Sequence, residues 1–578
     1  MRGKTGLLIG VMIMVGALVA SACGGPAATP TAQPTVRPTA TTQPTATAAP
    51  AQSTPTPTRV APTATPSGPQ PVYGGIVRRP YRTDPGHLDL QKARDGANWM
   101  TVPPLVNWLV SFSVSDGIQP DLASSWDVSQ DGKTYTFKLN PNAKWQDGNP
   151  VTADDIVFNI NRLAFSDELK GGPYRPTFLP LASVDKVDNL TVRLTLSRVS
   201  ASFLPSLGQI GIAIYPKHMP IADFSKKTPE AVVGSGPFKL KEWVQNVRVT
   251  EVRNPTYFKK DSAGRQLPYL DTLELAIIPD VSAQYSAFRT GKLDMTTPLE
   301  STSLRGKEKS VTQDVPGSKV QIKNFNWVYL TFNAKVKPWD DVRVRKAFSL
   351  AISRQEFNQV AYEGLGTPYR ALTTPGTGFA FTEDQIKSWP GYNPNTRAAD
   401  LAEAKRLLQE AGVQGSSIAG KLPSRDVYAQ TAEVIAAQYR AALGANWTID
   451  SMDAARTLKV YADRSFDVLS GHYGSALPDP SAELAPFLLS SSGLNWGGFN
   501  DPTVDSRLNE IDATLDRAKR MQLSQSLEKE VLIDKVWFVI TGSEPFAHAW
   551  LGRLQGYNGY TLNQEGPYLQ LEKVWVSS

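Results

Sequence analysis

Residues 119–163, QPDLASSWDVSQDGKTYTFKLNPNAKWQDGNPVTADDIVFNINRL, are the stretch that decides the fold. The dipeptide Asp131-Gly132 is typical of a hairpin turn, and Asp147-Gly148 indicates a second turn. Between them, residues 134–139 alternate between apolar and polar side chains, which predicts a strand with one buried face. Locally the stretch therefore predicts a turn, a strand, a second turn and then a helix.

The helix is predicted to begin after Thr152, whose hydroxyl suits an N-cap. Asp155 lies three residues further on, as in a capping box, and Asp154 is also favoured by the helix dipole. Ile156, Ile160 and Leu163 share one face of this helix, at positions i, i+4 and i+7. We interpret the two aspartates as capping residues in preference to an acid/base pair.

Length and composition limit the classes of protein to which this chain can belong. A chain of 578 residues exceeds one hydrophobic core, so two or three domains are expected. With 41% hydrophobic and 20% charged residues the composition fits a soluble globular protein, and a net charge of +6 without a strongly basic run gives no reason to expect a nucleic-acid partner. One cysteine and four scattered histidines exclude thiol chemistry in the globular part and disfavour a zinc site, so no metal or cofactor is predicted.

The N-terminus has the pattern of an export signal. Arg2 and Lys4 precede a short apolar run at 7–20, which is well short of the roughly 20 residues that span a bilayer. Ala20-Ser21-Ala22-Cys23 resembles a bacterial lipobox, so Cys23 is predicted to be lipidated, with ordinary signal cleavage as the alternative. From Pro26 to about Gln70 the chain is rich in Pro, Thr and Ala, a composition that predicts a disordered tether.

Residues 122–158 closely resemble the signature of the family 5 extracellular solute-binding proteins, the dipeptide/oligopeptide-binding type that serves ABC importers. Further landmarks of that family follow in order, at 233–240 (VGSGPFKL), 253–258 (RNPTYF) and 338–347 (PWDDVRVRKA). Gly234-x-Gly236 alone would be a weak nucleotide-loop motif, but it lacks the third glycine and the following helix.

The resemblance implies an α/β, periplasmic-binding-protein-like fold of type II, in which a hinge joins two α/β lobes and the first lobe carries an inserted subdomain. Placed on this sequence, it predicts a signal peptide at 1–22, lipidated Cys23 and its tether at 23–71, the first part of lobe I at 72–118, the inserted subdomain at 119–231, the second part of lobe I at 232–325, lobe II at 326–542 and a return to lobe I at 543–578. Residues 105–110 are predicted to form a helix that carries Trp108, and 398–411 and 427–443 two longer helices.

Candidate ligand contacts follow from the resemblance and from the position of aromatic residues beside turns, because solute sites are clefts lined by aromatics with a few polar groups. For each aromatic alone, burial in the core is the competing interpretation. The predicted contacts are Tyr81, Arg82, Trp108, Trp327, Tyr369, His472, Tyr473, Ser475, Asp479 and Trp496.

Residues 471–480 (GHYGSALPDP) bear on the ligand. In peptide-binding members the equivalent segment resembles GWxGD…DP, and its first Asp pairs with the peptide amino group. Here His472 stands at the Trp position and Ser475 at the Asp position, while Asp479 is retained and is expected to shape the turn. The Arg that precedes a Tyr-Asn-Pro run in dipeptide binders is also absent before Tyr392. A short free peptide is therefore disfavoured, because a buried ammonium group needs a counter-charge.

Three hypotheses result. The first is a lipid-anchored, monomeric receptor on the outer face of the bacterial cell membrane, which binds a small solute or peptide and works with an ABC permease and its ATPase. The second is an exported hydrolase with paired carboxylates, either Asp154 with Asp155 or Asp467 with Asp479. The third is a surface binder that feeds a sensor. The motifs of catalytic sites are missing from the sequence, which favours a binding protein over an enzyme.

Overall fold

The computed structural model describes residues 69–93, 96–113, 117–220, 226, 228–297, 304, 306–324, 326–474, 477, 479–559 and 571–577. The predicted signal peptide, Cys23, the tether as far as Gly68 and Ser475 lie outside the described residues. Below, the predicted boundaries serve as names for lobe I, the inserted subdomain and lobe II; the boundaries themselves stay predictions. Among the described residues, no helix combines the length and the apolar character that a membrane crossing requires.

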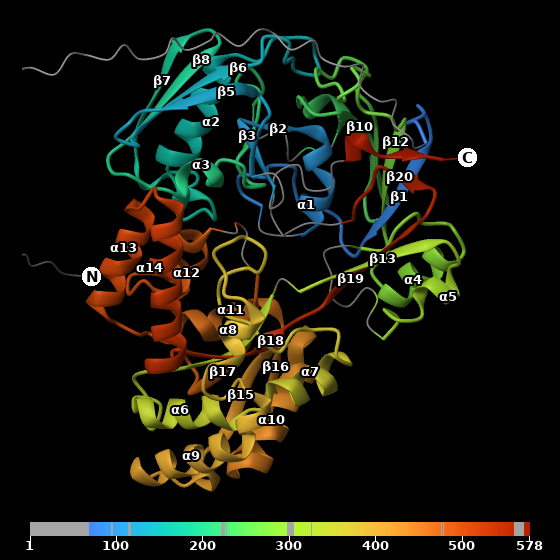
Figure 1. Ribbon diagram of the computed structural model, residues 1–578. Helices are drawn as coiled ribbons and strands as arrows, with labels where there is room; N and C mark the ends of the chain where they lie inside the picture. Colours follow the sequence, from blue (N-terminus) through green and yellow to red (C-terminus); the bar gives the residue numbers. More distant parts are fainter. Residues whose placement is uncertain are drawn as a thin grey trace, which may run out of the picture. The chain divides into compact units, whose positions relative to one another are not determined.

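Lobe I is built on a four-stranded sheet with the order β1-β12-β11-β10 (Figure 1). β1 and β12 run parallel, and the other neighbours run antiparallel. In β12 the sequence TLELAI alternates, so Leu273 and Leu275 are buried in the lobe I core. The elements of lobe I other than the strands of the crossover to lobe II are β1 (Ile76–Tyr81), α1 (Gly96–Thr101), η1 (Pro103–Leu105), β2 (Asn107–Trp108), β3 (Val110–Ser113), β10 (Phe238–Val244), β11 (Arg248–Arg253), β12 (Thr272–Ile277), α4 (Val281–Arg289), α5 (Val311–Asp314), β20 (Leu554–Gln555), η9 (Leu571–Lys573) and β21 (Trp575–Val576).

The inserted subdomain confirms the local structure predicted for 119–163. Its antiparallel sheet has the order β5-β6-β8-β7, and β6 has the predicted bounds Thr134–Leu139. The capping box is also present: the Asp155 carboxylate accepts a hydrogen bond from the Thr152 backbone amide at 2.8 Å. Ile156 and Ile160 of α2 share one core with the buried face of β6. The elements are β4 (Gly117–Pro120), β5 (Ala123–Val128), β6 (Thr134–Leu139), α2 (Ala153–Phe165), η2 (Arg175–Phe178), β7 (Leu181–Asp188), β8 (Thr191–Leu196), α3 (Phe203–Ser206), β9 (Ala213–Ile214) and η4 (Pro229–Ala231).

Lobe II surrounds a three-stranded antiparallel sheet, β17-β14-β18. Every residue of the central strand β14 (WVYLTF) is buried, because Val328 and Leu330 pack into one apolar core while Trp327 and Tyr329 pack into another. The elements are β14 (Trp327–Phe332), α6 (Val342–Ala351), α7 (Arg354–Tyr362), α8 (Glu383–Lys387), η5 (Pro394–Thr396), α9 (Arg397–Glu410), η6 (Gly415–Ser417), β15 (Ala419–Arg425), η7 (Asp426–Tyr428), α10 (Ala429–Leu443), β16 (Asn446–Met452), α11 (Ala454–Ala462), β17 (Val468–Tyr473), α12 (Pro480–Leu488), α13 (Pro502–Ala513), α14 (Arg517–Lys529), η8 (Glu530–Asp534) and β18 (Phe538–Ser543).

Two neighbouring strands connect the lobes. β13 (Ser318–Lys323) pairs antiparallel with β19 (Phe546–Leu551), and each continues into the lobe II sheet: β13 leads to β14, and β18 leads to β19 (Figure 1). The two crossing points are tied together, because the Glu544 amide donates to the Asn326 carbonyl at 3.0 Å. The chain therefore enters and leaves lobe II at one place, which is the hinge.

The helix predicted at 105–110 is wrong. Trp108 lies in β2, which pairs with β9, and β3 follows directly and pairs with β4. The Trp108 amide donates to the Asp121 carboxylate at 3.0 Å instead of to a carbonyl of a preceding helical turn. Pairing with distant strands has therefore overridden the local helical pattern.

Candidate ligand-binding site

Three of the predicted contacts meet at one edge of the lobe II sheet. The antiparallel register places Trp327 opposite Tyr473 and opposite Ser543, and it places Val328 opposite His472. The start of β14 and the ends of β17 and β18 thus lie together, at the edge from which both strands of the hinge depart. Residues that are 146 positions apart in sequence are neighbours here, which the sequence alone did not establish.

An aromatic cluster occupies this edge. The Tyr473 ring lies 5.9 Å from Trp327 and 4.3 Å from Phe487, and Phe487 lies 5.9 Å from Trp496, all measured between ring centroids. Trp327 is 2% exposed and belongs to the core, whereas Tyr473 and Trp496 are only partly buried. Burial nevertheless raises the pKa of the Tyr473 hydroxyl to about 12, so this group stays a neutral hydrogen-bonding group at physiological pH. Tyr473 and Trp496 are therefore the members of the cluster whose exposed surface is available for contact with a ligand.

His472 is held in a buried polar network beside this cluster. Its Nδ1 lies 3.1 Å from Glu544 Oε2, and both side chains are fully buried. Its Nε2 lies 2.9 Å from the Thr431 hydroxyl, which itself donates to the Tyr428 carbonyl at 2.7 Å. Because that hydroxyl has one proton and uses it, His472 Nε2 must carry a proton and donate to Thr431. On the other side of the ring, His472 Nδ1 faces the Glu544 carboxylate.

Three residues of this network, Thr431, Tyr428 and Glu544, were missed by the sequence-based prediction. Tyr428, at the end of η7, stacks on the His472 ring with centroids 3.7 Å apart and planes within 5° of parallel. Glu544 lies in the crossing from β18 to β19 and also accepts from Asn326 Nδ2 at 3.3 Å. A signal for Glu544 existed in the sequence, because it is the only acidic residue in the predominantly apolar segment 536–549. No local pattern marks Tyr428.

Tyr369 belongs to the same apolar core as Trp327, and both Tyr369 and Asp479 have structural partners in lobe II. The Tyr369 hydroxyl accepts from Gln355 Nε2 at 2.8 Å, and the ring is 8% exposed. Asp479 caps α12 by accepting from the Ser481 amide at 3.0 Å, and its carboxylate receives both Nη groups of Arg520, at 2.5 and 2.7 Å. This arrangement agrees with the expectation that Asp479 shapes the turn.

Tyr81, Arg82 and Trp108 belong to lobe I. Tyr81 ends β1 and packs partly buried against the lobe I core, while Arg82 is exposed. Trp108 is 1% exposed, and its indole donates to the Ile210 carbonyl at 3.1 Å, which makes it a core residue. The structure therefore joins Trp327, His472, Tyr473 and Trp496 into one region and leaves these three in another lobe.

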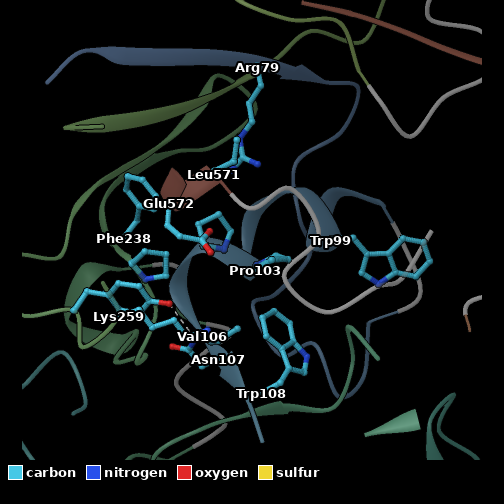
Figure 2. Close-up of a pocket in the computed structure, with 13 residues that line it drawn as sticks. Arg79, Trp99, Pro103, Val106, Asn107, Trp108, Phe238, Lys259, Leu571 and Glu572 are labelled. Carbon is cyan, nitrogen blue, oxygen red and sulfur yellow. Dashed lines mark hydrogen bonds between the residues drawn. The ribbon is translucent and has the colours of Figure 1, made fainter. Parts of the chain in front are cut away.

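A cavity of about 30 Å³ lies inside lobe I (Figure 2). Arg79 enters it from one side, while Trp108, Asn107 and Lys259 line the other. Arg79 is fully buried and bonds Glu251 at 3.3 Å, and burial raises the pKa of Glu251 to about 8. Since a single water needs about 10–15 Å³, this cavity fits a few waters at most and is too small for a peptide or sugar.

The carboxylate pairs of the hydrolase hypothesis do not form an acid/base pair in a cleft. Asp154 is a partly exposed residue that pairs with Lys186 at 2.7 Å, which lowers the pKa of Asp154, while Asp155 caps α2. Asp479 is ion-paired with Arg520, whereas Asp467 is exposed. In the described part of the chain, no cluster of His, Cys, Asp and Glu has the geometry of a metal site.

Two α/β lobes, an inserted subdomain and a two-strand hinge with partly exposed aromatics beside it define the class of extracytoplasmic solute-binding proteins. The chain belongs to the bacterial extracellular solute-binding proteins, family 5, whose sequence profile for the middle region matches residues 117–495.

Relatives and solved structures agree with this assignment. The chain is 29% identical over 452 residues to the dipeptide-binding protein of Escherichia coli, a match that covers 73% of this chain and 80% of the relative. It is also 29% identical over 486 residues to heme-binding protein A of Haemophilus influenzae, covering 78% and 84% of the two chains. The crystal structure of the ABC transporter substrate-binding protein CtaP from Listeria monocytogenes superposes with a TM-score of 0.74 at 23% identity, covering 88% of this chain and all of that one. These likenesses confirm the type II fold and the solute-binding class expected from the sequence.

Proposed function

We propose that this chain is the lipid-anchored, monomeric receptor of an ABC importer, which binds a small polar solute at the hinge side of lobe II, without converting it, and delivers it to the permease. The single observation that carries the proposal is the cluster of Tyr473, Trp496 and the His472–Glu544 pair at the edge where both hinge strands leave the lobe II sheet. A solute that contacts this edge lies where closure of the lobes would enclose it. A transport receptor needs no catalytic carboxylate pair, whereas a hydrolase requires one. The arrangement at this edge therefore fits transport better than hydrolysis.

The charges at this edge bear on the class of ligand. Relatives of equal identity are named for dipeptides and for heme, so identity does not choose between ligands. The imidazole of His472 and the carboxylate of Glu544 face each other at 3.1 Å and both side chains are fully buried, so the pair offers little net charge to a ligand terminus. Ser475 replaces the aspartate that serves as the amino clamp in peptide binders. We infer a ligand held by backbone-type hydrogen bonds and aromatic contacts: a longer or terminally blocked peptide, a sugar or another neutral polar solute.

A panel of solutes tests this proposal by thermal shift and calorimetry. Binding raises apparent stability in proportion to the logarithm of ligand concentration over Kd, so we expect a shift with blocked peptides or oligosaccharides and a smaller one with free dipeptides. Trp496→Ala is expected to weaken the binding by about tenfold, as for an aromatic contact residue. Phe165→Ala, which removes an exposed ring of α2, is the matched control and is expected to leave affinity unchanged. No response to peptides, oligosaccharides or metal chelates would contradict the proposal.

The anchor is tested separately at Cys23. The apolar run that ends in Ser-Ala-Cys is the motivation, and two acyl chains hold a protein at a membrane much more firmly than one. We expect the native protein to fractionate with membranes and Cys23→Ser to move it to the soluble fraction, with unchanged ligand affinity. Mass spectrometry that found an unmodified N-terminus at another position would refute the anchor and leave the receptor function standing.

A further inference from the structure

One loop of the inserted subdomain is bonded to the end of a lobe II helix. The Asp512 carboxylate, near the end of α13, accepts hydrogen bonds from Arg198 Nη1 at 2.8 Å, from Ser200 Oγ at 3.1 Å and from Ser202 Oγ at 2.8 Å. The backbone takes part as well, because the Ala201 amide donates to the Asp512 carbonyl at 2.7 Å. All four donors come from residues 198–202, and α13 and α3 are neighbours in Figure 1.

The position of Asp512 is unfavourable for its own helix. A carboxylate in the last turn of a helix faces the negative end of the helix dipole, where a cation would be favoured. Asp512 lies one residue before the end of α13 and is 9% exposed, so it is also largely removed from water. Its charge is compensated by the donors from the other subdomain and not by α13. An aspartate at this position is therefore explained by the contact across the two parts of the chain.

The neighbouring surfaces are also close. Gly132, in the turn between β5 and β6, lies so near the Leu515 side chain that an added Cβ would come within 2.8 Å of Leu515 Cδ1 and 3.6 Å of Val199 Cγ1. Leu515 follows α13 and is 53% exposed in spite of this contact. A small apolar contact between Gly132, Val199 and Leu515 therefore lies beside the hydrogen bonds of Asp512, and its Leu515 side chain is partly exposed to solvent.

This contact joins parts that the hinge separates. The inserted subdomain precedes β13, whereas α13 lies between β14 and β18, so a rotation of lobe II about the two hinge strands moves residue 512 relative to 198–202. We propose that residues 198–202 and Asp512 form a latch that holds the inserted subdomain against lobe II before any ligand binds, and that the arrangement of the lobes it holds is the closed one. The latch is distinct from the ligand site, because its residues belong to α13 and the inserted subdomain and not to the hinge edge of the lobe II sheet.

The latch sets affinity without contacting the ligand. When only the closed form holds a solute tightly, the apparent Kd equals the intrinsic Kd divided by the closed fraction. A latch that raises the closed fraction in the free protein lowers the apparent Kd for every solute by the same factor. This part of the inference rests on the proposed solute-binding function, whereas the latch itself can be measured without ligand.

Hydrogen exchange of the ligand-free, full-length chain in detergent tests the latch. The Ala201 amide is protected only while it donates to Asp512, so its exchange rate reports opening. Asp512→Ala removes the three side-chain acceptor contacts, and we expect Ala201 to exchange about tenfold faster, the factor appropriate to lost hydrogen bonds to a charged group. Glu510→Ala, an exposed carboxylate on the same helix, is the matched control and is expected to leave the rate unchanged.

The double variant Ser200→Ala/Ser202→Ala removes two donors from the opposite side, and it keeps the test valid should Asp512→Ala fold poorly. We expect it to accelerate Ala201 exchange and to increase the radius of gyration in small-angle scattering, as Asp512→Ala does. Unchanged exchange at Ala201 in a folded Asp512 or serine variant would overturn the latch. Faster exchange combined with no binding by any solute of the panel would support the latch while refuting the proposed receptor function.

Discussion

Replacing Arg520 by methionine is expected to lower the free energy of unfolding by about 3–5 kcal/mol, because it leaves a buried carboxylate without its counter-charge. Arg520 is 5% exposed and Asp479 4%, and the guanidinium also donates to Ser481 Oγ at 2.8 Å and to the Ile511 carbonyl at 3.1 Å. One side chain thereby ties α14 to α12 and to α13. Urea unfolding measures the loss, and a change in midpoint at constant slope would assign it to stability.

Two further variants separate charge from packing. Lys519→Met changes an exposed cation next to Arg520 in sequence, and we expect it to alter the free energy of unfolding by no more than about 0.5 kcal/mol. Adding Asp479→Asn to Arg520→Met should recover part of the loss, because an amide is cheaper to bury unpaired than a carboxylate. If Arg520→Met alone were as stable as the unmodified chain, the prediction would be contradicted, and Asp479 would have to be solvated or protonated.

Replacing Gly234 by alanine is expected to cost about 3 kcal/mol, since a Cβ at this position would lie 1.7 Å from the Leu105 carbonyl oxygen. Gly236 is equally constrained, because its Cβ would come within 2.5 Å of the Pro104 carbonyl and 2.4 Å of the Leu105 carbonyl carbon. The two backbones are joined there by a hydrogen bond from the Gly236 amide to Leu105 O at 3.0 Å. A side chain must therefore push the entry to β10 away from η1, and neither backbone can move without breaking that bond.

Gly86→Ala is the control for this prediction. No atom lies within 4 Å of a Cβ built at Gly86, so alanine there should be tolerated and can even stabilise the chain slightly by restricting the unfolded state. Thermal unfolding of both variants gives the comparison. A Gly234→Ala protein with the melting temperature of Gly86→Ala would contradict the close approach of β10 and η1.

The glycines at 234 and 236 illustrate what the sequence could and could not establish. The motif was assigned to a family landmark and not to a nucleotide loop, and a strand, β10, begins directly after it at Phe238. The reason for both glycines lies in residues 104–105, more than a hundred positions earlier, and no local pattern contains that information. Similarly, the strand at 134–139 and the cap at Thr152 were predictable because alternation and capping act over a few neighbours.

The candidate site depended on contacts at longer range. His472 was identified from its place in residues 471–480, but its partners Thr431 and Glu544 are 41 and 72 positions away. Trp108 was predicted as a contact on a helix, and it is a core residue on a short strand because pairing with β9 outweighs the local pattern. Aromatic residues look alike in sequence whether they fill a core or line a cleft, and only their exposure separates Trp327 from Trp496.

The adjacency of Asn326 and Glu544 has a consequence for recombination between relatives. Since the chain enters lobe II after β13 and leaves it before β19 at two hydrogen-bonded residues, lobe II is topologically an insertion into lobe I with neighbouring ends. Two splices, one at each crossing, exchange the whole lobe while leaving the sheet of lobe I and the inserted subdomain covalently intact. Chimeras built at these joints would carry Tyr473 and Trp496, which belong to the proposed binding site, from one family member to another together with the whole of lobe II.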